Sequence, residues 1–63
     1  MKVTKINKDY KMVKYTSPAK GGKCIAVVPT DNKGIAGAIF NEVIGNGKSE
    51  KEIVDAAKEA AKA

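Results

Sequence analysis

The pattern of apolar and polar residues in the first half of the chain predicts strands. Apolar and polar residues alternate over residues 9–17, as they do in a half-buried strand. Residues 23–29 form a continuous run rich in β-branched residues, which is typical of a strand covered on both faces. The turn residues at 17–22 join these two runs into a predicted hairpin. Residues 2–6 are a shorter strand candidate, with its turn at 7–9.

The second half of the chain has the spacing of helices. Apolar side chains recur every four residues in two adjacent stripes, and this predicts a buried helix: Ile35, Ile39 and Val43, and beside them Ala36, Phe40 and Ile44. We expect the glycine turn at 45–47 to end it, with Gly45 in the left-handed conformation. Ser49 followed by Glu52 is a capping box that starts a last helix. That helix carries a face of small residues that must either dock very closely or fray at the end: Ala56, Ala57 and Ala60.

These elements predict a single small α+β domain spanning residues 1–63. We expect a small antiparallel sheet of two to three strands in the N-terminal half, packed against two C-terminal helices, in the order β-β-β-α-α. A core of this size is only marginally sufficient. Cys24 is the only cysteine, so an internal disulfide is excluded and we expect this side chain in the core. Self-association is another way to stabilise so small a core, and a homodimer is therefore an alternative to a monomer.

Lysines recur at every third position near the N-terminus, at residues 2, 5, 8, 11 and 14. Residues 1–23 hold seven lysines and one acid, a net charge of +6, whereas residues 24–63 hold five lysines and six acids, a net charge of −1. Lysine is a flexible point charge without the bidentate geometry of arginine, so this surface attracts acidic partners without specifying them. We expect Lys8 at a turn and the other four lysines on the two strands that flank it. Lysine at a sheet edge also prevents aggregation, so solubility, edge protection and codon bias stand as alternatives to a binding role.

The chain lacks the residues that most catalytic and metal sites require. It has no histidine, which removes the commonest zinc ligand and proton shuttle, and nothing is available to activate Cys24 as a nucleophile. Gly47, Lys48 and Ser49 match the end of a phosphate-binding loop, but the position of that motif's first glycine is Glu42. We therefore expect no enzyme activity, no cofactor and no metal. A free cysteine, without a signal peptide or a long apolar run, predicts a cytoplasmic protein.

Residues 24–63 resemble a ribbon-helix-helix DNA-binding domain in their predicted order of strand, helix, glycine turn and capped helix. The resemblance implies that the strand of this segment enters a DNA groove. That family carries polar or basic residues on the strand, whereas residues 24–28 are all apolar here, and a basic segment precedes them. We therefore do not assign the chain to the family.

Two functional hypotheses follow from the basic N-terminal third. The first is a non-enzymatic, stand-alone binding protein that regulates or inhibits a larger partner with an acidic surface, for example as an accessory or anti-defence factor. The second is a non-specific nucleic-acid-binding protein whose lysines contact phosphates. Few aromatic residues are available to stack on bases, which disfavours the second. The candidate partner-binding residues are the same for both: Lys2, Lys5, Lys8, Tyr10, Lys11, Lys14, Tyr15, Lys20 and Lys23.

Overall fold

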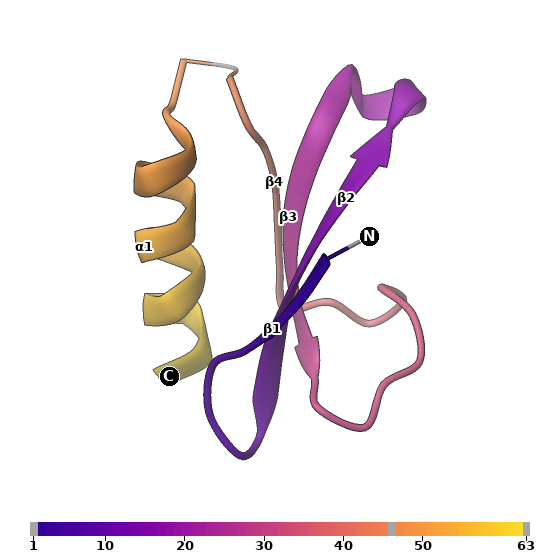
Figure 1. The fold of residues 1–63 in the computed structure, drawn as a ribbon, viewed down its shortest axis with the longest axis vertical. Helices are drawn as coiled ribbons and strands as arrows, with labels where there is room; N and C mark the ends of the chain where they lie inside the picture. The colour runs from indigo at the N-terminus through magenta and orange to yellow at the C-terminus, as the bar shows by residue number, and fades with distance from the viewer. Residues whose placement is uncertain (1, 46, 63) are drawn as a thin grey trace.

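The computed structural model describes residues 2–45 and 47–62, which form one antiparallel sheet and one helix (Figure 1). The strands pair with their neighbours in chain order. The elements are β1 (Lys2–Lys5), β2 (Tyr10–Ser17), the short 3-10 helix η1 (Pro18–Lys20), β3 (Gly22–Pro29), β4 (Phe40–Val43) and α1 (Glu50–Lys62). In Figure 1 the helix stands to one side of the sheet, opposite the long segment that joins β3 to β4.

The N-terminal half follows the prediction from alternation. β2 and β3 form the expected hairpin, in which Tyr10 pairs with Pro29 and Ser17 with Gly22. β1 is the expected shorter strand, and it pairs antiparallel with β2. Asn7 closes the turn between them, because its side-chain oxygen accepts hydrogen bonds from the backbone of Asp9 and of Tyr10.

The predicted order β-β-β-α-α is wrong, because the structure has four strands and a single helix. The segment with helical spacing, residues 31–44, is instead an irregular loop followed by β4. β4 pairs with Cys24–Val27 of β3 and so provides hydrogen-bond partners for that edge. Gly37, within this segment, has a φ value of 81°, which a continuous right-handed helix does not accommodate. The element order of a ribbon-helix-helix domain is therefore absent from the described residues.

The helix packs on one face of the sheet, which we call the helix side. Its buried residues Ile53, Ala57 and Ala61 recur every four positions and thus share one face of α1. Of the predicted alanine face only Ala57 is fully buried, because Ala56 is exposed and Ala60 is half-buried. They form a cluster with three buried sheet residues: Met12, Ile25 and Val27. The helix thereby covers the middle of β2 and β3, and this contact forms most of the helix-side core.

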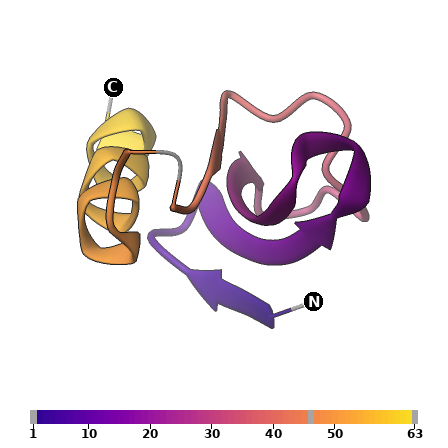
Figure 2. The same ribbon diagram turned by 90° about the horizontal axis from the view of Figure 1, so that it is seen from above.

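The opposite face of the sheet, the loop side, is covered by residues 30–39, which arc over it on the side away from α1 (Figure 2). The alternation of β2 and β3 buries four side chains there: Val13, Cys24, Ala26 and Val28. Lys11 and Ile39 hold the segment in place, because the Lys11 ammonium donates to the carbonyl of Asn32 and the Ile39 amide to that of Val27. The core position predicted for Cys24, and the burial of β3 on both faces, are confirmed.

Both ends of the helix have capping contacts. The hydroxyl of Ser49 accepts a hydrogen bond from the backbone amide of Glu52 at 3.3 Å, so the predicted N-cap is confirmed. At the other end, the Asn7 side chain donates to the carbonyl of Ala61. Gly45 is left-handed as expected, but in the turn after β4, and Asn46 of the predicted glycine turn lies outside the described residues. Among the described residues no helix has the length and apolar character needed to cross a membrane.

Candidate binding site

The register between β1 and β2 shows how the lysine run is arranged in space. Lys2 lies directly opposite Lys14, and Lys5 directly opposite Lys11. Successive strand residues point to opposite faces, so the first pair lies on the helix side and the second on the loop side. Lys8 lies in the turn between the strands. The run therefore forms two lysine pairs on opposite faces rather than one continuous basic face.

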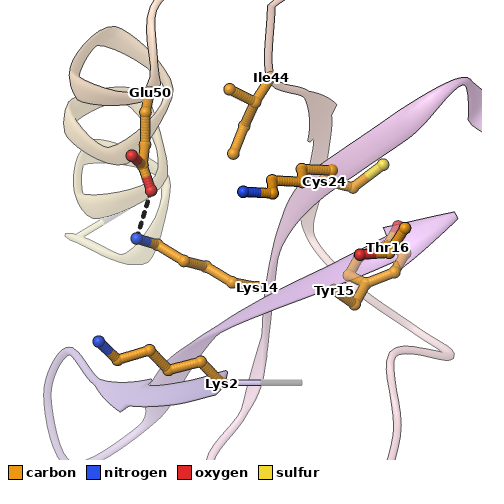
Figure 3. A pocket seen from close by; sticks show the side chains of 8 residues that line it. Lys2, Lys14, Tyr15, Thr16, Cys24, Ile44 and Glu50 are labelled. Atoms are coloured by element: carbon orange, nitrogen blue, oxygen red, sulfur yellow. Dashed lines mark hydrogen bonds and ion pairs between the residues drawn. The ribbon is translucent and has the colours of Figure 1, made fainter.

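A notch on the helix side gathers part of the basic charge. It has a volume of about 470 Å³ and opens between the start of α1 and the far end of the β2–β3 hairpin (Figure 3). Its polar and apolar lining includes Lys2, Lys14, Thr16, Lys23, Ile44 and Glu50. Three lysines from three strands thus surround one carboxylate, which leaves a net charge of +2 among these residues. We call this feature the lysine notch.

Lys14 and Glu50 form an ion pair across the notch, in which the lysine ammonium donates to a carboxylate oxygen of Glu50 (Figure 3). Glu50 is the first residue of α1, where a negative charge also interacts favourably with the helix dipole. Both side chains remain accessible to water. The pair therefore adds little stability, but it fixes the position of Lys14 on one wall of the notch.

The positive charge of the notch is reflected in the pKa of Glu50. The hydrogen bond from Lys14 and the charge of that lysine lower this pKa from its ordinary value of 4.5, and Lys23 and Lys2 contribute further attraction. Because the folded-state pKa is depressed, the stabilisation from this carboxylate is present above its unfolded-state pKa. It is lost as the pH falls through the folded-state pKa.

We expect Lys14→Gln to raise the Glu50 pKa more than Lys23→Gln or Lys2→Gln does, because only Lys14 both donates a hydrogen bond and acts through its charge. NMR titration of the Glu50 carboxyl carbon measures this directly. Lys33→Gln, in the loop on the other side of the sheet, is the matched control and should leave the pKa unchanged. An equal pKa shift in all four variants would contradict a specific effect of the notch lysines on Glu50 and indicate a general effect of net charge.

Four of the predicted lysines lie outside the notch lining. Lys5 is exposed on the loop side, and Lys11 is bonded to the backbone of the covering loop. Lys20 lies in η1 at the end of the hairpin. Lys8 borders a separate hollow of about 370 Å³, together with Asp9, Thr30 and Asp31, where acids outnumber lysines. These lysines do not add to the basic lining of the notch.

The two predicted tyrosine anchors do not lie together. Tyr10 is half-buried and packs against the helix-side core. Tyr15 lies at the border of the notch, and its hydroxyl donates to the side-chain oxygen of Asn41 at 2.7 Å. Tyr10 therefore has a structural role here. The Tyr15 side chain lies on the loop side, because the alternation of β2 directs it to the face opposite Lys14 and Thr16.

The sequence prediction missed three of these lining residues: Thr16, Ile44 and Glu50. The last two were missed because they lie far from the lysine run along the chain. Ile44 follows β4, and Glu50 begins α1. The capping signal at Ser49 marked the start of a helix, but nothing in the sequence pattern placed that start beside β2. No group of three or more metal-ligating side chains occurs among residues 2–45 and 47–62.

Comparison of the chain with protein-family models, with curated proteins and with solved structures finds no match.

Proposed function

We propose that this chain is a small non-enzymatic binding protein that regulates or inhibits a larger protein by binding an acidic part of its surface. The observation that carries the proposal is the lysine notch, in which Lys2, Lys14 and Lys23 from three strands surround a single carboxylate. An acidic side chain entering the notch can interact with several ammonium groups at once. Ile44 adds an apolar contact at the same place.

The ion pair between Lys14 and Glu50 gives the site some selectivity for its partner. A partner carboxylate competes with Glu50 for Lys14, whereas Lys2 and Lys23 form no ion pair within the described residues. The expected partner therefore presents more than one carboxylate. The same lysines repel partner surfaces that carry positive charge.

Binding to nucleic-acid phosphates is the second candidate. The lysines support it, since phosphate contacts need positive charge and no base-specific geometry. The protein partner is favoured because the basic lining lies inside a concave notch and the remaining run is divided over two faces. A duplex backbone requires an extended basic surface instead.

The test is to capture partners from a lysate of the native host, with and without nuclease, and then to measure association kinetics with the purified partner. We expect the triple variant Lys2→Gln, Lys14→Gln, Lys23→Gln to associate about tenfold more slowly at low salt, because electrostatic steering is lost. The control variant changes three lysines outside the notch to glutamine and has the same net charge: Lys8, Lys33 and Lys58. It should associate at close to the wild-type rate.

Two results would contradict the proposal. If both triple variants lose association rate equally, net charge rather than the lysine notch controls binding. If nuclease abolishes capture, and affinity for duplex DNA falls with salt at a slope of about 0.9 per phosphate contact, the chain binds nucleic acid.

A further inference from the structure

The strand β1 is an open edge of the sheet. Its four residues are all exposed, and it pairs only with β2 among the residues that the structure describes. Figure 2 shows β1 at the border of the sheet, with neither α1 nor the 30–39 loop beyond it. Its outward backbone groups are therefore available to a further strand.

Both ends of β1 carry unbalanced positive charge. The Lys2–Lys14 and Lys5–Lys11 pairs each place like charges directly opposite one another, an arrangement that destabilises strand pairing. Lys14 has Glu50 as its partner, and Lys11 has the carbonyl of Asn32. Lys2 and Lys5 take part in none of the ion pairs among the described residues. An acid placed beside each of them would relieve both repulsions.

An exposed apolar side chain lies between these lysines. Val3 is 55% exposed, although it is directly opposite the buried Val13. It continues the loop-side apolar row of Val13 and Ala26 to the edge of the sheet. The edge thus offers three features together: free backbone groups, an apolar position and a lysine on each side of it.

We propose that β1 receives an extended acidic segment of the partner as a fifth strand. The inference rests on the proposed function, since it specifies how the acidic partner binds beside the lysine notch. The segment carries two carboxylates three residues apart, one opposite Lys2 and one opposite Lys5, and an apolar residue opposite Val3. Strand addition of this kind takes its affinity from backbone hydrogen bonds and its specificity from the side chains.

The spacing of three follows from the register. Residues three apart on a strand point to opposite faces, so one carboxylate meets the Lys2–Lys14 pair and the other meets the Lys5–Lys11 pair. Acids two or four apart point to one face and neutralise only one pair. In antiparallel pairing, which every strand pair of this sheet adopts, the segment reads acid, any residue, apolar residue, acid. A second copy of β1 is the wrong occupant, because it would place lysine opposite lysine.

The experiment uses synthetic peptides and the full chain. One peptide contains Glu-Thr-Val-Glu between serine-rich flanks, and its control contains the same residues as Glu-Val-Glu-Thr, with the acids two apart. We expect the first to bind about tenfold more tightly and to slow hydrogen exchange of β1 amides. A third peptide, with an N-methylated backbone in the central positions, should lose both effects. Lys5→Gln should weaken the first peptide several-fold, whereas Lys8→Gln should not.

A charge-reversed variant gives a second test that does not require tight binding of the glutamate peptides. The variant Lys2→Glu, Lys5→Glu should prefer a Lys-Thr-Val-Lys peptide over the glutamate peptide. Equal binding of the ordered and shuffled peptides, or unchanged exchange of the β1 amides, would overturn strand addition. If that happens while the triple notch variant still associates more slowly with the partner than its control variant does, the proposed function stands and only this mode of binding is wrong. Equal association rates of these two triple variants would instead contradict the proposed function.

Discussion

Replacing Ile53 with alanine is expected to destabilise the protein by about 2–5 kcal/mol. Ile53 is the largest side chain that α1 buries, at 1% exposure, and it packs in the cluster with Met12, Ile25 and Val27. Alanine would leave a cavity that this small core has little freedom to fill. Domains of this size have little stability in reserve, so we expect the melting temperature to fall by about 10 °C or more. Thermal unfolding followed by circular dichroism measures the change.

The matched control is Ile39→Ala. The helical spacing of residues 35–44 predicts that Ile39 is buried in a helix, whereas the structure leaves it 49% exposed in the loop before β4. We expect a loss below about 1 kcal/mol, as for most surface substitutions. A loss of stability equal to that of Ile53→Ala would contradict the exposed position of Ile39 in a loop. It would support a buried position in a helix instead.

The substitution Ala57→Asp should destabilise the protein at least as much as Ile53→Ala does. Ala57 is fully buried between α1 and the sheet, so an aspartate there places a carboxylate among apolar side chains. An unpaired buried charge costs several kcal/mol, and the short aspartate side chain does not reach water. We expect the variant to be largely unfolded at room temperature, with loss of amide dispersion in the NMR spectrum.

The adjacent substitution Ala56→Asp controls for helix propensity. Both variants replace alanine with aspartate in the middle of α1, so both lose about 0.7 kcal/mol of propensity. Ala56 is exposed, and its variant should fold with no further penalty. Similar destabilisation of the two variants would show that α1 does not dock through the face that contains Ala57.

The first half of the fold was predictable because its signals are local. Alternation over residues 9–17, the apolar run 23–29 and the turn residues between them specify a hairpin without reference to the rest of the chain. The capping box at Ser49 is local as well, and the structure confirms the Ser49 cap. The burial of Cys24 followed from its place within an apolar strand.

Residues 35–44 could not be predicted in the same way. Their apolar stripes at spacings of four match a helix, and the alternative reading as a short strand covers only four residues, Phe40–Val43. What decides between them is the edge of β3, where backbone groups of Cys24–Val27 need hydrogen-bond partners. Local propensity is a weak determinant wherever tertiary pairing of this kind is available.

The candidate site, too, was predictable from the sequence only in part. The basic charge of the N-terminal third identified Lys2, Lys14 and Lys23 as candidates, but equally Lys5, Lys8 and Lys11, because charge and spacing alone do not assign a face. The register of β1 on β2 separated the Lys2–Lys14 pair from the Lys5–Lys11 pair. Ile44 and Glu50 joined the notch because the chain after β4 returns to place α1 beside the sheet.

The sequence by itself determined the β2–β3 hairpin, the start of the last helix and the location of the basic charge in the first third of the chain. Each of these depends on residues that are close together along the chain. Only the tertiary structure decided that residues 40–43 complete the sheet, which lysines share the notch, and that β1 remains an open edge. These outcomes depend on backbone hydrogen bonds and contacts between distant segments, whose free energy outweighs the local preference of any one segment.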